Sequence, residues 1–149
     1  FKASSQSGAV SVGAVQEEVM KAGLLGEMIG IAFQIKDDIF DYFESPELGK
    51  PTGNDMLEGK LTLPALYVLN QTRDDSLKQT ALKIRSLEAS KEEIANFVET
   101  VKEKGGIEYA TRMMYEFRDK ALALVPASAD SSLKEALTAY IDYVIERNK

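Results

Sequence analysis

The chain has 149 residues, of which 44% are hydrophobic and 28% are charged, and its formal net charge is -6. It contains no cysteine, histidine or tryptophan, which excludes thiolate and imidazole zinc sites, cysteine nucleophiles, Ser-His-Asp triads and disulfides. Any chemistry must therefore use carboxylates, lysines, amides, hydroxyls or a cation that prefers oxygen ligands.

The charge pattern also limits the partners. An isoelectric point near 4.8 and the lack of a basic run predict no nucleic-acid partner. No stretch approaches the roughly 18 apolar residues of a membrane-spanning helix, and residues 1–15 lack the features of a signal peptide. We therefore expect a cytoplasmic protein without a transmembrane segment. Because the chain starts at Phe1 rather than at methionine, we expect an upstream part to be missing.

Helical patterns dominate the first half of the chain and predict an all-α fold. Residues 3–14 are small and weakly patterned, as in a closely packed helix or its tail. Apolar residues then recur at helical spacing from Gln16 to about Phe43. Residues 45–61 are charged and rich in turn residues, so they are expected to form a loop.

Later helices carry clearer start and stop signals. Thr62 is a candidate N-cap, and Ser90 with Glu93 and Ser132 with Glu135 are candidate capping boxes. The helices expected here cover residues 62–71, 90–105, 107–124 and 132–144. No alternating strand pattern of useful length is present.

The long helix gathers polar residues on one face. At about 100° per residue, this face carries Glu27, Gly30, Gln34, Asp37, Asp38, Asp41 and Glu44. The opposite face is predicted to be core and carries Leu24, Leu25, Met28, Ile29, Ala32, Ile35, Ile39, Tyr42 and Phe43.

An acidic stripe of this kind is compatible with the solvated side of an amphipathic helix, but other features favour a binding site. Neighbouring carboxylates repel one another by a few tenths of a kcal/mol, with no Lys or Arg four residues on to relieve them. Gly30 costs about 1 kcal/mol relative to alanine in a helix, which is explained if something approaches the backbone closely. A bound divalent cation would relieve the repulsion.

Carboxylates on one rigid helix suit Mg²⁺, which usually takes one or two of them together with substrate phosphates. A calcium loop is less consistent, because the D-x-D-x-D-G spacing is absent. Lys50 and Lys60 follow the helix, and lysines near a carboxylate-bound cation would form a diphosphate clamp. Each lysine taken alone is equally compatible with ordinary surface charge.

Several segments together carry a specific pattern. They are residues 26–42 (GEMIGIAFQIKDDIFDY), 49–55 (GKPTGND), 58–64 (EGKLTLP), 105–110 (GGIEYA) and 140–147 (YIDYVIER). A D-D-x-x-D match alone is weak, but flanked by F-Q and E-G-K-x-T-L-P it is highly specific. The chain resembles the trans-polyprenyl diphosphate synthases, with residues 37–41 as their second aspartate-rich motif.

The resemblance implies an antiparallel helix bundle of the isoprenoid synthase type around a deep cavity, with residues 1–149 as the C-terminal part of one helical domain. It implies a prenyltransferase that condenses isopentenyl diphosphate with an allylic diphosphate, usually as a homodimer. Asp37 and Asp41 would hold Mg²⁺ on the allylic diphosphate, and Asp38 would assist through water.

The remaining site residues are also implied by the resemblance. Lys50 and Lys60 would contact the diphosphate oxygens, Gln34 would lie beside the reacting allylic group, and Phe33 would pack on the isopentenyl tail. Gln34, Asp37 and Lys50 are the expected catalytic residues.

One part of the family pattern is missing, because no D-D-x-x-D precedes Asp37. We therefore expect the C-terminal half of a longer synthase, inactive in prenyl transfer on its own but able to bind Mg²⁺ and diphosphate weakly. Apolar surface left by missing helices would favour self-association. The alternatives are a non-catalytic subunit derived from the family, a terpene-cyclase-like relative, and an unrelated helical module that binds Mg²⁺ or diphosphate.

Overall fold

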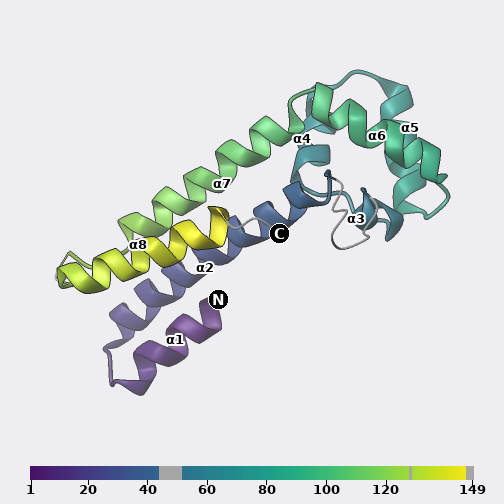
Figure 1. Cartoon of the computed structure of the whole chain (residues 1–149). Helices are drawn as coiled ribbons and strands as arrows, with labels where there is room; N and C mark the ends of the chain where they lie inside the picture. The colour runs from purple at the N-terminus through teal and green to yellow at the C-terminus, as the bar shows by residue number, and fades with distance from the viewer. Residues whose placement is uncertain (44–51, 128, 147–149) are drawn as a thin grey trace. The chain divides into compact units, whose positions relative to one another are not determined.

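The structure is a computed structural model and describes residues 1–43, 52–127 and 129–146. Within these ranges every regular element is a helix, which confirms the all-α fold (Figure 1). In chain order the helices are α1 (Lys2–Ser11), α2 (Gln16–Phe40), α3 (Asn54–Leu57), α4 (Leu63–Gln71), α5 (Asp75–Arg85), α6 (Lys91–Glu103), α7 (Gly106–Ala123) and α8 (Ser131–Glu146). They form two compact units, one of Phe1–Lys36 with the chain from Met113 onward, the other of Asp37–Arg112.

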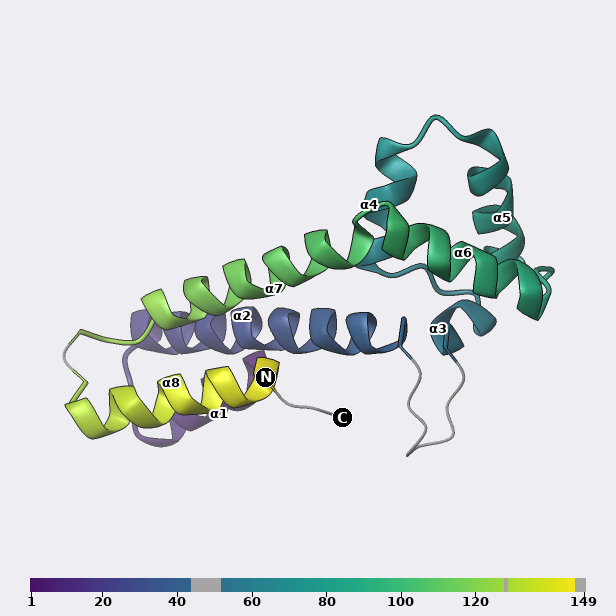
Figure 2. The same cartoon turned by 45° about the horizontal axis from the view of Figure 1, so that its top comes forward.

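The first unit contains two helical hairpins (Figures 1 and 2). In one, α1 folds back along the first part of α2, and in the other α8 folds back along the last part of α7. The core between them is formed by Ile29, Ala121, Ile141 and Val144. Arg118 of α7 places Nε and Nη2 each 2.7 Å from Asp142 Oδ1 of α8, so a charged pair also ties the second hairpin together.

Two glycines on α2 allow Phe1 to lie close to the helix backbone. A Cβ atom at Gly26 would lie 2.8 Å from the Phe1 carbonyl oxygen, and one at Gly30 would lie 3.3 Å from the Phe1 side chain. The close neighbour predicted for Gly30 is therefore the Phe1 ring in this structure. Larger side chains at these positions would push α1 away from α2.

The second unit is organised around α6, which contacts α3, α4 and α5 (Figure 2). Its core includes Ile84 of α5 and Phe97, Val98 and Val101 of α6, each at most 2% exposed. The rings of Tyr67 on α4 and Tyr109 on α7 stack with centroids 4.1 Å apart. This packing holds together the unit that contains the acidic end of α2.

Two of the predicted helix starts are present as expected. Ser90 Oγ accepts the Glu93 N–H at 3.1 Å, and Glu93 Oε2 accepts the Ser90 N–H at 2.8 Å, so the capping box of α6 is confirmed. Thr62 occupies the N-cap of α4, although its side chain makes no capping hydrogen bond.

The predicted capping box of Ser132 with Glu135 is wrong. The helix α8 begins at Ser131, so Ser132 lies inside its first turn and not at its N-cap. Asp130 takes the capping role, since its Oδ1 accepts the Leu133 N–H at 2.8 Å. A carboxylate at a helix N-terminus also gains from the helix dipole, which favours it over a serine hydroxyl.

The structure differs from the expected elements in other places. Helix α5 was not predicted, and α3 forms a single turn inside the expected loop. Helix α2 ends at Phe40 instead of about Phe43, and Leu24 and Phe43, expected in the core, are 44% and 48% exposed. In the described part of the chain no helix, not even α2 with its 25 residues, is long and apolar enough to cross a membrane.

Tyr42 is a polar side chain inside the core of the second unit. It is 1% exposed, and no described residue meets hydrogen-bond geometry with its hydroxyl, although Thr62 and Ala65 lie near it. Burial raises the pKa of Tyr42, and the charge of Asp41 adds to that effect. The hydroxyl is thus a buried group that pays a desolvation cost.

Replacing Tyr42 with phenylalanine is therefore expected to leave the free energy of unfolding unchanged or to raise it by up to about 1 kcal/mol. The ring keeps its packing, and only the unsatisfied hydroxyl is removed. Urea unfolding of the two proteins measures the difference. A loss of more than about 1 kcal/mol would mean that the hydroxyl is well bonded in the folded protein.

Candidate functional site

The acidic residues lie at the C-terminal end of α2. Asp37 and Asp38 are inside the helix, and Asp41 follows its last residue; all three are partly buried. Gln34 lies about one turn earlier and is exposed. A helix C-terminus carries partial negative charge, so each carboxylate there costs roughly 0.3–1 kcal/mol. The last turn of α2 contains no basic residue, so compensation must come from elsewhere.

Asp41 receives part of that compensation from the start of α3. Its main-chain oxygen accepts the Gly53 N–H at 2.8 Å. Its carboxylate accepts two more, with Oδ1 3.0 Å from the Asn54 nitrogen and Oδ2 3.1 Å from the Asp55 nitrogen. Three consecutive backbone donors at the start of α3 are thus bound by one residue. Gly53 adopts φ +77° at the N-cap, a conformation that favours glycine.

Lys60 is connected to the same group of residues, Asp41 and the start of α3. Its N–H donates to the Asp55 carbonyl at 2.8 Å. Its Nζ donates to Glu58 Oε2 at 2.6 Å and lies 3.8 Å from Asp55 Oδ1. The hydrogen bond and charge of Glu58 raise the pKa of Lys60, and the carboxylates of Asp55 and Asp41 add to this. Lys60 is therefore a cation held among carboxylates, with its side chain 60% exposed.

The other predicted site residues are placed as follows. The Phe33 ring packs against the Phe1 ring, with centroids 5.2 Å apart, and its predicted contact with an isopentenyl tail stays a prediction. Lys50 lies outside the described residues. The structure therefore brings Asp37, Asp38, Asp41 and Lys60 into one unit and leaves Lys50 undescribed.

The donor set fits a magnesium ion bound in part by the protein. Asp37, Asp38 and Asp41 supply carboxylate oxygens, and a carboxylate oxygen has two lone pairs, so it can accept a hydrogen bond and also coordinate a cation. In the ranges that the structure describes, no three acidic side chains are gathered closely enough to enclose a metal. Mg²⁺ does not require such a cage, because it commonly takes one or two carboxylates and completes its shell with water and phosphate oxygens.

Sequence reasoning did not assign a role to Asp55 or Glu58. Both contact Lys60, and Asp55 also offers the backbone N–H that Asp41 accepts. The acids two and five residues before Lys60 are a visible signal of ion pairing. The Asp41 contact has no such signal, because its partners are 13 and 14 residues away in the chain.

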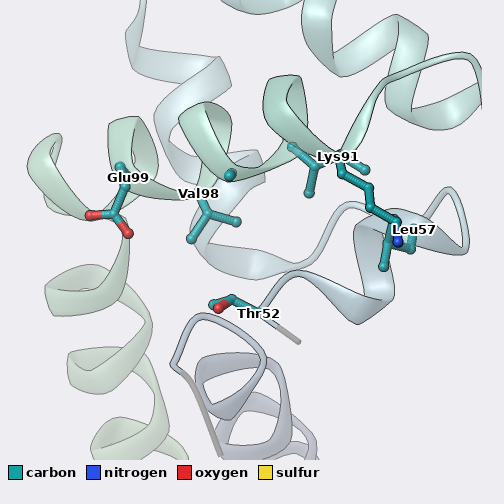
Figure 3. Close-up of a pocket in the computed structure, with 7 residues that line it drawn as sticks. Thr52, Leu57, Lys91, Val98 and Glu99 are labelled. Carbon is teal, nitrogen blue, oxygen red and sulfur yellow. The ribbon is translucent and has the colours of Figure 1, made fainter. Parts of the chain in front are cut away.

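A separate pocket of about 370 Å³ lies between α6 and the segment around α3. Its lining residues are Thr52, Leu57, Lys91, Ile94, Ala95, Val98 and Glu99. Figure 3 shows Thr52 opposite Val98, with Lys91 and Glu99 toward the two ends of the α6 surface. Of the described residues, neither Lys60 nor the aspartates at the end of α2 lines this pocket.

The chain has relatives among known proteins. The polyprenyl synthetase family profile matches residues 1–101. Heptaprenyl diphosphate synthase component 2 of Geobacillus stearothermophilus is 35% identical over 143 residues, which cover 93% of this chain and 43% of that protein. The chain thus spans about half the length of the curated relatives it matches.

Solved structures show the same relationship. The geranylgeranyl pyrophosphate synthase of Bacteroides thetaiotaomicron matches with a TM-score of 0.93 and 54% identity, over 99% of this chain and 48% of that one. A polyprenyl synthase of Caulobacter crescentus, complexed with calcium and isoprenyl diphosphate, matches with a TM-score of 0.83 and 29% identity, over 100% of this chain and 46% of that one. Sequence profile, curated relative and solved structures agree, and the chain belongs to the polyprenyl synthetase family.

Proposed function

We propose that the chain supplies the second aspartate-rich motif of a trans-polyprenyl diphosphate synthase. Its acidic face consists of the carboxylates of Asp37, Asp38 and Asp41 at the end of α2. The reaction would join isopentenyl diphosphate to an allylic diphosphate and give an all-trans polyprenyl diphosphate. The observation that carries this proposal is the connection, through Asp41 and α3, between the acidic end of α2 and Lys60. It combines carboxylates for a cation with a cation for phosphate oxygens in one unit.

In this proposal Asp37 and Asp41 hold Mg²⁺ against the allylic diphosphate, and Asp38 acts through water. The ion, when bound, neutralises the negative charge that grows on the departing diphosphate. The partial burial of these aspartates strengthens their attraction to a cation, since the local dielectric constant is lower than in bulk water. The Caulobacter structure, complexed with calcium and isoprenyl diphosphate, supports a divalent ion beside diphosphate in this family.

The other residues have complementary roles in the proposal. Lys60 and Lys50 contact diphosphate oxygens and stabilise the leaving group as the allylic carbon–oxygen bond breaks. Gln34 lies near the allylic group, and Phe33 provides an apolar surface for the isopentenyl tail. The expelled diphosphate takes the proton that is lost when the new double bond forms. A site of this kind needs neither histidine nor cysteine, in agreement with the composition.

Calorimetry tests the binding half of the proposal. The chain is titrated with a non-reactive allylic diphosphate analogue, once with Mg²⁺ and once with excess EDTA. Binding is expected only with Mg²⁺, because carboxylates without a cation repel diphosphate. Equal binding in EDTA, or no binding in either titration, would contradict the proposed role of the acidic face.

Prenyl transfer by this chain alone is expected to be absent. No D-D-x-x-D motif precedes Asp37 in this chain. Only one group of carboxylates is therefore available for the cations that the diphosphate needs while the allylic carbon–oxygen bond breaks. The assay incubates the purified chain with labelled isopentenyl diphosphate, an allylic primer and Mg²⁺. Steady formation of labelled polyprenyl diphosphate would refute this expectation.

We also propose that the chain associates with itself or with a complementary chain through its exposed apolar side chains.

A further inference from the structure

Asp41 makes contacts that a simple metal ligand does not need. All three of its oxygens accept backbone N–H groups, at Gly53, Asn54 and Asp55, over distances of 2.8 to 3.1 Å. These donors are consecutive and lie at the start of α3. Each carboxylate oxygen therefore already has one partner in the structure.

Helix α3 depends on such support. It is a single turn of four residues, and a turn of that length is not stable by itself in water. Two features hold it in place: the bonds to Asp41 at its start and the burial of Met56, which is 2% exposed. The first of these features connects α3 to the end of α2.

Lys60 depends in turn on α3. Its main-chain N–H donates to the Asp55 carbonyl at 2.8 Å. The Asp55 N–H in turn donates to the Asp41 carboxylate. Its ammonium group contacts Glu58 and Asp55, both of which belong to or directly follow α3. A continuous series of hydrogen bonds thus leads from Asp41 to the backbone of Lys60.

We infer that Asp41 is a positioning residue, which binds the start of α3 and through it fixes Lys60 relative to the acidic end of α2. The inference rests on the proposed function only in the claim that Lys60 contacts diphosphate. This role is additional to the metal ligation proposed above, because part of the effect of Asp41 on diphosphate would pass through Lys60.

The substitution Asp41→Asn tests this inference, since it keeps the size and one acceptor oxygen but turns an NH₂ group toward the other backbone donor. Amide hydrogen exchange in residues 53–60 is expected to become about tenfold faster or more. Asp74→Asn is the matched control. Asp74 Oδ1 also accepts two backbone N–H groups, from Ser76 and Leu77, at the start of α5. Asparagine keeps this single acceptor oxygen and caps a helix as well as aspartate does, so the control should leave exchange around residues 76–80 and in 53–60 almost unchanged.

A double-mutant comparison separates positioning from metal binding. The probe is inorganic pyrophosphate with Mg²⁺, and its dissociation constant is measured for wild type, Asp41→Asn, Lys60→Ala and the double variant. Each single variant is expected to weaken binding about tenfold. Asp41→Asn should cost at least about threefold less affinity in the Lys60→Ala background than in wild type, because without the ammonium group its placement no longer matters.

Two results would overturn the inference. One is unchanged exchange in residues 53–60 of Asp41→Asn, and the other is an equal loss of affinity from Asp41→Asn in wild type and in Lys60→Ala. The second result would mean that Asp41 acts only as a ligand of the ion, with the proposed function intact. If wild type binds no pyrophosphate, the proposed function fails, and the exchange data alone decide whether Asp41 holds α3.

Discussion

Replacing Asp37 with alanine should weaken Mg²⁺-dependent binding of a diphosphate about 100-fold or more. Substitution of residues that only support a metal ligand already costs about 10- to 100-fold, and Asp37 is proposed to touch the ion itself. Asp37 lies in the last turn of α2, where the helix dipole opposes a carboxylate. Its removal should therefore leave the helix intact or slightly more stable while binding is lost. Calorimetry and urea unfolding measure the two effects separately.

Asp75→Ala is the control for charge. Asp75 belongs to the same unit, its side chain is 93% exposed, and its Oδ1 lies 3.9 Å from Lys78 Nζ. The control changes the net charge by the same amount and should alter diphosphate affinity by less than about twofold, because an exposed charge is screened by salt. Equal losses in Asp37→Ala and Asp75→Ala would show that only the overall charge matters.

Replacing Gly106 with alanine should destabilise the second unit by about 3 kcal/mol. A Cβ atom there would lie 2.6 Å from Val101 Cγ1, 2.8 Å from the Pro64 carbonyl oxygen and 2.9 Å from the Val101 carbonyl oxygen. Two of these neighbours are backbone atoms, which cannot move aside by changing a rotamer. The start of α7 would have to shift away from α4 and α6. Urea unfolding, followed by amide exchange of α6, measures the loss.

Gly8→Ala provides the comparison. Gly8 lies inside α1, and a Cβ atom there would meet nothing within 4 Å. Alanine is the better helix former by about 1 kcal/mol, so this variant should be as stable as wild type or slightly more stable. A similar loss in both variants would contradict the explanation by close packing at Gly106.

The helices that the sequence predicts best are those with strong local signals. The capping box at Ser90 and the two glycines after α6 mark both ends of that helix, and the structure confirms them. Helix α5 escaped prediction although Asp74 caps it and Leu77, Ala81 and Ile84 form its buried stripe. Its apolar residues are few, so much of its stability comes from packing on α6 that no local pattern reveals.

In the candidate site, too, local features could be predicted and contacts between distant residues could not. The residue types of the acidic face, and their place on one helix, follow from spacing alone, because helical geometry fixes which side chains are neighbours. The use of Asp41 as an anchor for α3 does not follow, since its partners at Asn54 and Asp55 are 13 and 14 residues away in the chain. The partner of Gly30 was equally hidden, because Phe1 is brought to it by the folding of α1 onto α2.

The position of the bound ion is the most direct test of the proposed Mg²⁺–diphosphate site. Mn²⁺ takes the same oxygen ligands as Mg²⁺, and it broadens the NMR signals of nearby amides. With pyrophosphate present, substoichiometric Mn²⁺ should broaden the amides of residues 34–41 and 53–60 first, and Asp37→Ala should abolish that pattern. Broadening centred on another acidic segment, such as Glu17–Glu18 or Glu92–Glu93, would contradict the proposed Mg²⁺–diphosphate site at the end of α2.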